Sequence, residues 1–202
     1  MKFLLFFFIL FSPLIRWLIF NLKVNFVIKH IIWTCFKWLL TIFIILGYKL
    51  PFDISFESFI YGIFIFLGSV LYFFFSSFLF KFKIFDGLKE IYNLPLIFRI
   101  LGGISAGITE EIIYRGFLVL FINEFLNNLF LSCFFSLLIF GIFHIPLWGF
   151  IASTQISIWS IILYSYFLIK GEIFALIIAH SLNDIFFFLK TPLTNKFLIK
   201  QR

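Results

Sequence analysis

The sequence predicts an all-α fold, a polytopic bundle of about seven transmembrane helices, and three observations lead to this expectation. Of the 202 residues, 63% are hydrophobic and only 12% are charged. Soluble domains average about 45–50% apolar and about 25% charged residues. The mean hydropathy is +1.17. The apolar residues also form successive runs, and a run of about 20 helical residues crosses the hydrocarbon core of a bilayer.

The expected spans can be placed in order along the chain. The first continues apolar past Pro13 without a small-x-small cleavage site, so we expect a retained span rather than a signal peptide. Lysine-containing segments separate the first four spans, a turn near Asn123–Asn128 follows the fourth, and "KGE" precedes the last. The spans are expected at residues 3–20, 31–47, 56–80, 96–122, 130–147, 156–169 and 173–189.

The connection between the fifth and sixth spans is unusual. The segment "PLWGFIASTQ", Pro146–Gln155, is short and broken by Pro and Gly. Two interpretations fit it, an ordinary interfacial loop or a segment that dips into the membrane and admits water.

Basic residues assign the two sides of the membrane. Seven spans place alternate loops on opposite sides, and cytoplasmic loops are enriched in Lys and Arg. One side holds Lys23, Lys29, Lys81, Lys83, Lys89, Lys190, Lys196, Lys200 and Arg202, and the other holds Lys2, Lys49 and Lys170. We therefore expect a cytoplasmic C-terminus and an N-terminus outside. The same bias explains the net charge of +7 without a nucleic-acid partner, because no basic cluster is long enough for one.

Three charged residues lie inside the fourth span. The stretch "GITEEIIYRGF" carries Glu110, Glu111 and Arg115, and each costs about 2.5–3.5 kcal/mol at the bilayer centre. Glu111 and Arg115 are four residues apart, so an ion pair on one helix face is expected. Glu110 has no obvious partner in its own helix, and an unpaired glutamate in a dry site is suited to accept a proton. The alternative is a buried ion pair with a spare carboxylate that fixes helix packing. Among the other cations, Arg16, Lys37 and Arg99 are expected near span ends, where their side chains can reach the interface.

Further polar residues lie in the fifth and seventh spans. "FGIFH" ends at His144, and "HSLND" contains His180, Asn183 and Asp184. A single membrane histidine is usually a hydrogen-bonded packing residue, but this number of titratable groups on three helices favours a site. At about 1.5 Å per residue, the chain travels roughly 20 Å from Glu110 to the next turn and returns. His144 and His180 should therefore share one layer with Glu110.

A pair of glycines precedes Glu110. Gly103 and Gly107 form a GxxxG pattern one turn before it, which lets a neighbouring helix approach closely.

Taken together, these residues resemble a known family. "EEIIYR" fits EExxxR, "FGIFH" fits FxxxH, and "HSLND" fits Hxxx(N/D), in that order on successive hydrophobic segments. The pattern is similar to the CPBP intramembrane proteases, which include the CAAX prenyl endopeptidases and the bacterial Abi proteins linked to bacteriocin self-immunity. The resemblance covers residues 95–190 as a protease core. Residues 1–94 form a transmembrane region without a signature, and residues 191–202 form a basic cytoplasmic tail.

The resemblance implies a site inside the bundle, open to water from one side, that hydrolyses peptide bonds. Glu110 would activate the attacking water, and Glu111 would support it while pairing with Arg115. His144 and His180 would assist the water, stabilise the oxyanion or bind a metal. Asp184 falls where many members have asparagine. A carboxylate donates a hydrogen bond only when protonated, and the nearest amide, Asn183, is about 100° away on the helix.

The resemblance also raises the question of a metal, since the family is often described as metalloproteases. Glu110, His144 and His180 could supply three zinc ligands. The sequence has no HExxH motif, and a glutamate–histidine mechanism without metal explains the same residues. We favour the metal-free mechanism, and no other cofactor is expected.

Three functions from different classes are open. The first is an intramembrane endopeptidase acting on a membrane-associated, prenylated or bacteriocin-type peptide. The second is a non-catalytic immunity or binding protein that uses the same polar site. The third is a proton or ion transporter, disfavoured because the chain is short and has no repeated half. The expected partners are a peptide substrate and the lipid bilayer. The Phe-, Ile- and Lys-rich composition is typical of an AT-rich genome and fits a bacterial or organellar chain, and we expect a bacterial cell membrane as the location. The sequence leaves the oligomeric state open.

Overall fold

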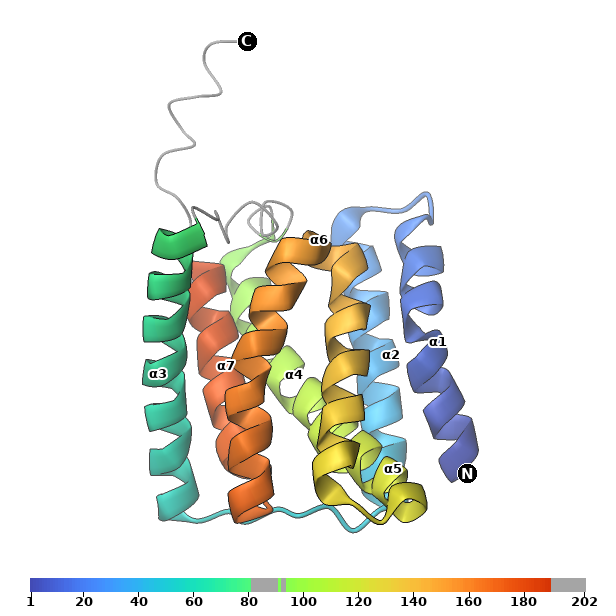
Figure 1. The fold of residues 1–202 in the computed structure, drawn as a ribbon. Helices are drawn as coiled ribbons and strands as arrows, with labels where there is room; N and C mark the ends of the chain where they lie inside the picture. The colour runs from blue at the N-terminus through green and yellow to red at the C-terminus, as the bar shows by residue number, and fades with distance from the viewer. Residues whose placement is uncertain (81–90, 92–93, 190–202) are drawn as a thin grey trace.

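The computed structural model describes residues 1–80, 91 and 94–189, and the long regular elements in this part of the chain are all helices. The predicted all-α bundle is confirmed, with helices running up and down side by side (Figure 1). Five helical segments are long and apolar enough to cross a membrane: Lys2–Phe20, Phe26–Gly47, Phe56–Ser76, Leu129–Pro146 and Gly149–Lys170. A shorter apolar helix covers Phe174–Leu189. The protein is therefore a multi-pass integral membrane protein.

The order of the elements agrees with the predicted passes. The helices are α1 (Lys2–Phe20), α2 (Phe26–Gly47), α3 (Phe56–Phe80), α4 (Leu96–Glu110), the π-helix η3 (Glu111–Leu118), α5 (Val119–Leu126), α6 (Leu129–Lys170) and α7 (Phe174–Leu189). Helices α4, η3 and α5 follow one another without a break and make up the fourth pass, while α6 doubles back and makes two. The second pass begins at Phe26, five residues before the predicted start at residue 31.

The reversal within α6 corrects both interpretations of Pro146–Gln155. Helical structure continues through the segment apart from Gly149, whose backbone angles are φ 77° and ψ 168°. Figure 1 shows α6 rising to this kink and then descending. Pro146 cannot supply a backbone donor and Gly149 adopts a positive φ at little cost, so a very short turn is sufficient. The segment is neither a loop nor a re-entrant stretch, because residues 150–155 already belong to the descending helix.

The two ends of the bundle agree with an odd number of passes. Helix α1 begins at one end and α7 finishes at the opposite end, where the α1–α2 connection also lies (Figure 1). Lys23 and Lys29 lie at this second end. The other basic residues predicted there, together with the tail 191–202, are outside the described residues: Lys81, Lys83, Lys89, Lys190, Lys196, Lys200 and Arg202. Which end faces the cytoplasm stays a prediction.

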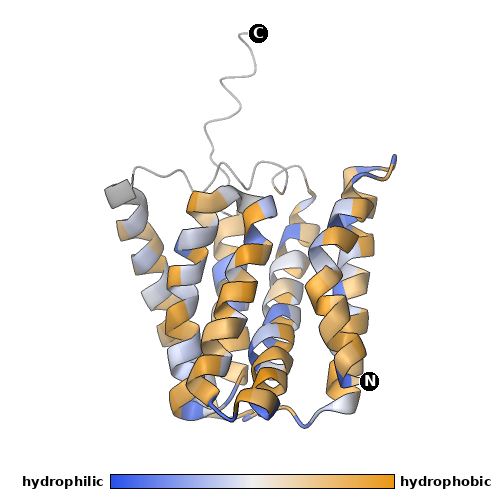
Figure 2. Cartoon of the chain, turned by 45° about the vertical axis from the view of Figure 1, so that its right-hand side comes forward, coloured by the Kyte–Doolittle hydropathy of each residue, from blue (hydrophilic) through white to orange (hydrophobic). Residues whose placement is uncertain are grey.

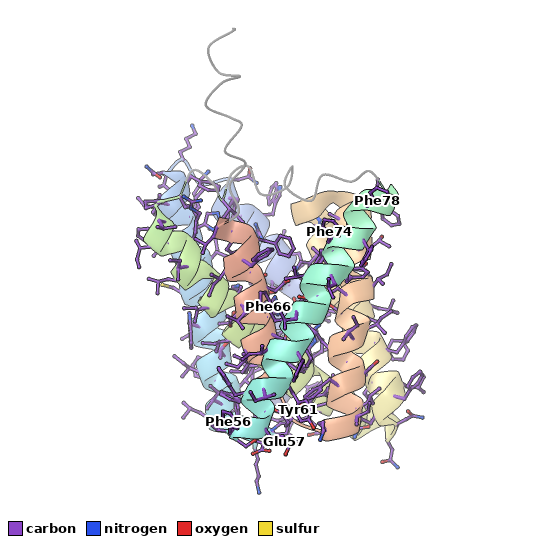
Figure 3. All side chains as sticks on the ribbon, turned by 90° about the vertical axis from the view of Figure 1, so that its left-hand side faces the viewer. Phe56, Glu57, Tyr61, Phe66, Phe74 and Phe78 are labelled. Carbon is purple, nitrogen blue, oxygen red and sulfur yellow. The ribbon has the colours of Figure 1, made fainter. Side chains whose placement is uncertain are left out.

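The surface has the character expected of a lipid-facing bundle. Hydrophobic residues cover the helices over most of their height, and hydrophilic residues gather mainly at the ends and inside (Figure 2). Helix α3 lies at the edge of the bundle and carries phenylalanines along its length (Figure 3). Phe56, Phe74 and Phe78 are all exposed, which suits contact with lipid rather than with a protein core.

Helices α4 and α7 pack closely. The contact lies at Gly103 and Gly107, the two glycines of the predicted GxxxG pattern. A Cβ atom on Gly107 would lie 2.6 Å from the backbone nitrogen of Ser181, and one on Gly103 would lie 2.9 Å from that of Ile185. Both distances are too short for any residue but glycine. This close approach positions α7 so that His180 lies level with the end of α4.

Replacing Gly107 with alanine should force α7 away from α4. We expect the free energy of unfolding to fall by about 1–3 kcal/mol, the usual cost of overpacking, measured by thermal unfolding in detergent. The matched control is Gly102→Ala in the same helix, where an added Cβ meets nothing within 4 Å. The control should be neutral or slightly stabilising. Equal stability of the two variants would contradict the close α4–α7 contact.

Candidate active site

The candidate site begins where α4 changes into the π-helix η3. Glu110 is the last residue of α4 and Glu111 is the first of η3. All eight residues of η3 are buried. π-Helices are rare and are often found at functional sites, because the wider turn re-aims side chains relative to an α-helix. Here the change of helix type lies between the two adjacent glutamates.

Glu111 forms a buried network with Arg115 and His180. The Arg115 guanidinium donates to Glu111 Oε1 at 2.9 Å, and His180 Nδ1 lies 2.6 Å from the same oxygen. Glu111 and Arg115 are completely buried. The guanidinium also lies over the rings of Phe140 and Tyr164, at 4.6 and 4.4 Å from their centroids. The ion pair predicted from the spacing is confirmed, and it holds the ring of His180 in a fixed orientation.

Glu110 pairs with Lys37, which was expected near the end of a span. The Lys37 ammonium donates to Glu110 Oε1 at 3.0 Å. The expectation that Lys37 lies near a span end is wrong, because α2 extends over Phe26–Gly47 and Lys37 is at its midpoint. The sequence offered Glu110 no obvious partner within its own helix, and the structure supplies the partner from a different helix, α2. Arg99, in contrast, lies in the first turn of α4, as expected.

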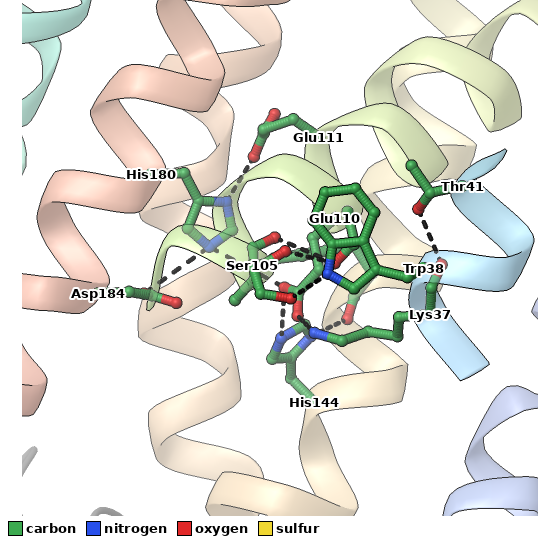
Figure 4. A network of polar contacts seen from close by, with 12 residues as sticks. Lys37, Trp38, Thr41, Ser105, Glu110, Glu111, His144, His180 and Asp184 are labelled. Atoms are coloured by element: carbon green, nitrogen blue, oxygen red, sulfur yellow. Dashed lines mark hydrogen bonds and ion pairs between the residues drawn. The ribbon is translucent and has the colours of Figure 1, made fainter. Parts of the chain in front are cut away.

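The other oxygen of Glu110 faces two imidazole rings (Figure 4). Glu110 Oε2 lies 3.8 Å from His144 Nε2 and 3.9 Å from His180 Nε2. The prediction that these three groups share one layer is confirmed. His144 Nδ1 lies 2.6 Å from the carbonyl oxygen of Phe140, so this nitrogen is the donor and Nε2 presents its lone pair to the site. The backbone carbonyl four residues earlier thereby fixes the tautomer.

Two adjacent residues of α7 face different neighbours. Asp184 Oδ1 lies 3.8 Å from His180 Nε2, on the site side of the helix. Asn183 is buried and accepts a hydrogen bond of 2.8 Å from Ser69 on α3. Asn183 therefore attaches α7 to α3, while Asp184 belongs with the candidate site.

Several residues around the site were not singled out from the sequence. Trp38, next to Lys37, donates through Nε1 to Ser105 of α4 at 2.8 Å. Trp159 of α6 packs edge-on against His180, with ring centroids 5.4 Å apart. A lysine within an apolar run needs a carboxylate partner, and this signal could have identified Lys37. The tryptophans had no comparable signal in a chain with 24% aromatic residues.

A cavity of about 540 Å³ connects the site with one end of the bundle. Its lining includes Glu110, His144, His180 and Asp184 at the site. The lining also includes Val27, His30, Ile91 and Leu94, at the end where α1 joins α2 (Figure 1). Phe98, Leu101 and Ile156 contribute apolar walls between these regions. The cavity thus offers a largely apolar path that leads to the Glu110 carboxylate.

The three possible zinc ligands named from the sequence, Glu110, His144 and His180, are not arranged as a metal site. Within the described residues, no group of three His, Cys, Asp or Glu side chains is placed to hold a metal ion. The Lys37 ammonium occupies one oxygen of Glu110, and its positive charge would repel a cation bound to the other. Glu110, His144 and His180 are therefore assigned no metal, and no chemical step is derived through one.

Comparison with known families gives one finding. A family model described as type II CAAX prenyl endopeptidase Rce1-like matches residues 92–186. The matched segment contains the glutamates, Arg115, both histidines and Asp184, but it does not include Lys37. No curated protein and no solved structure gives a significant match to the chain.

Proposed function

Through its domain of residues 92–186, the chain belongs to the Rce1-like type II CAAX prenyl endopeptidase family, and on this premise we propose an intramembrane endopeptidase with a water activated by Glu110. One observation carries the proposal. A single carboxylate oxygen lies within 4 Å of the Nε2 atoms of two histidines on separate helices. These distances are too long for direct hydrogen bonds, and they suit groups that share one small polar molecule such as water.

The proposed reaction uses Glu110 first as a base and then as an acid. The water oxygen attacks the scissile carbonyl carbon while one of its protons passes to Glu110 Oε2. The carbon–nitrogen bond of the resulting tetrahedral intermediate then breaks, and Glu110 returns the proton to the leaving nitrogen. The products are a new carboxyl group and a new amine, so atoms and charge balance.

The surrounding residues have supporting roles in this proposal. His144 and His180 hold the water against the substrate carbonyl. Lys37 keeps Glu110 ionised before the attack, and its positive charge beside the reacting groups would help to stabilise the developing oxyanion. Glu111 and Asp184 face the two nitrogens of His180 and orient its ring. Asp184 therefore acts through His180. This role does not require the side-chain amide of the asparagine that many family members have at this position.

The cavity suggests the class of substrate. Its apolar walls would accept a hydrophobic peptide segment or a peptide carrying a lipid chain, and it reaches the end of the bundle that the basic residues assign to the cytoplasm. We therefore propose a membrane-associated peptide as the substrate, entering from the cytoplasmic side of a bacterial cell membrane.

The test is turnover of a quenched fluorescent peptide library by the purified protein in liposomes, with and without a strong chelator. We expect cleavage, and we expect the rate to stay within about twofold in the chelator because Lys37 opposes a bound cation. Loss of cleavage in the chelator, restored by added zinc, would contradict the metal-free mechanism. Absence of cleavage of any peptide would favour a binding or immunity protein.

A further inference from the structure

Two polar side chains of α6 line the cavity without using their hydrogen-bonding atoms. Among the residues that the structure describes, Gln155 Oε1, Gln155 Nε2 and Trp159 Nε1 are buried and have no hydrogen-bond partner. Both residues line the cavity that contains Glu110, and they are only 5% and 2% exposed. A buried donor or acceptor without a partner costs free energy, so folded proteins rarely contain one without a reason.

The position of Gln155 relates it to the reacting groups. Gln155 and Trp159 are four residues apart on one helix, so they share a face. Trp159 packs directly against His180. Because this half of α6 descends from Gly149 (Figure 1), Gln155 lies one helical turn, about 5.4 Å, from Trp159 towards the end of the bundle that the cavity reaches. Tyr72 donates to the backbone carbonyl of Gln155 at 3.0 Å, which holds the backbone in place while the side-chain amide stays unengaged.

The chemistry of a primary amide identifies what it could bind. It offers a carbonyl oxygen as an acceptor and an NH₂ group as a donor, which is the complement of the N–H and C=O groups of a peptide backbone. An extended peptide advances about 3.3 Å per residue, so one helical turn corresponds to fewer than two residues. We propose that Gln155 binds the substrate backbone at a residue within two positions of the scissile bond, with Trp159 Nε1 as an additional donor. The inference rests on the proposed function, since it requires a peptide in the cavity.

The first test is kinetic and uses Gln155→Leu, which keeps the side-chain size but removes the amide. With the best-cleaved library peptide, we expect KM to rise about tenfold while kcat changes by less than about threefold. The matched control is Ser160→Ala. Ser160 Oγ is also buried without a partner among the described residues, but Ser160 is not among the residues lining the cavity. The control should keep wild-type kinetics.

A modified substrate tests the backbone contact itself. The peptide is N-methylated in turn at each position within two residues of the scissile bond. One of these peptides should be cleaved about tenfold less efficiently by the wild type, yet Gln155→Leu should cleave it as well as the unmodified peptide. If Gln155→Leu keeps a wild-type KM, or loses the same factor on N-methylation, the contact does not exist.

Photo-cross-linking separates this inference from the proposed function. The library peptides carry a benzophenone group and are bound to Glu110→Gln in liposomes, with and without Gln155→Leu. Cross-linking that depends on Gln155 without cleavage by the wild type would retain the subsite but reject the peptidase. Cleavage that is independent of Gln155 would reject the subsite alone. Absence of both cleavage and cross-linking would reject both.

Discussion

Replacing Glu110 with glutamine is expected to reduce peptide hydrolysis by roughly 10²–10⁴-fold, the range that a positioned general base contributes. Glutamine has nearly the same shape, and its amide oxygen can still accept the hydrogen bond from Lys37. It cannot take a proton from water at neutral pH. The loss should therefore appear in kcat, while peptide binding stays close to that of the wild type. Thermal stability should fall, because the largely buried Lys37 ammonium loses its counter-charge. The measurement is peptide turnover in liposomes beside a thermal unfolding curve for each variant.

Glu124→Gln is the matched control for this experiment. Glu124 lies on α5 and pairs with Lys2 at the surface, where both side chains are about half exposed. The same chemical change there should leave turnover unaltered. If Glu110→Gln keeps more than about a tenth of the wild-type rate, Glu110 is not the base.

Replacing Arg115 with methionine is expected to lower the free energy of unfolding by about 3–5 kcal/mol, the typical cost of breaking a buried ion pair from one side. The substitution leaves the Glu111 carboxylate with no exposure to water and without its cation. It also removes the contacts of the guanidinium with Phe140 and Tyr164. Denaturant-induced unfolding in mixed micelles would measure the change.

Two further variants make this prediction specific. The double variant Glu111→Gln, Arg115→Met removes both charges and should regain much of the stability, although His180 loses a charged partner and activity should stay low. Lys170→Met breaks the exposed pair between Lys170 and Glu57 and should leave the stability nearly unchanged, because water screens an exposed ion pair. An Arg115→Met protein as stable as Lys170→Met would show that the pair does not stabilise the fold.

Much of this architecture follows from regularities that the sequence displays directly. Apolar run length located the passes, because a bilayer sets the minimum length of a helix that crosses it. The four-residue spacing of Glu111 and Arg115 identified their ion pair. Counting the rise per residue brought Glu110, His144 and His180 to one layer. The glycines of α4 indicated a close neighbour, although only the structure shows that it is α7.

The features missed from the sequence depend on contacts between distant segments. Lys37 was misplaced because Lys29 and His30 looked like loop residues, whereas α2 runs through both. The α6 turn was misread because Pro146 and Gly149 mark a break without fixing how many residues the reversal takes. The π-helix from Glu111 to Leu118 was not predicted, because nothing in the composition of the segment marks it. The role of Gln155 and Trp159 could not be predicted, because it depends on the cavity that both residues line.

The ion pair between Lys37 and Glu110 also bears on how the protein is made. Lys37 comes from the part of the chain that carries no family pattern, whereas Glu110 lies inside the matched segment. During synthesis the lysine-bearing helix enters the membrane first, and each charge alone costs about 2.5–3.5 kcal/mol to insert. When α4 enters the membrane, Lys37 of α2 is therefore already present and can pair with Glu110. The matched segment alone therefore lacks the residue that pairs with Glu110, and α2 has to be present for the ion pair to form.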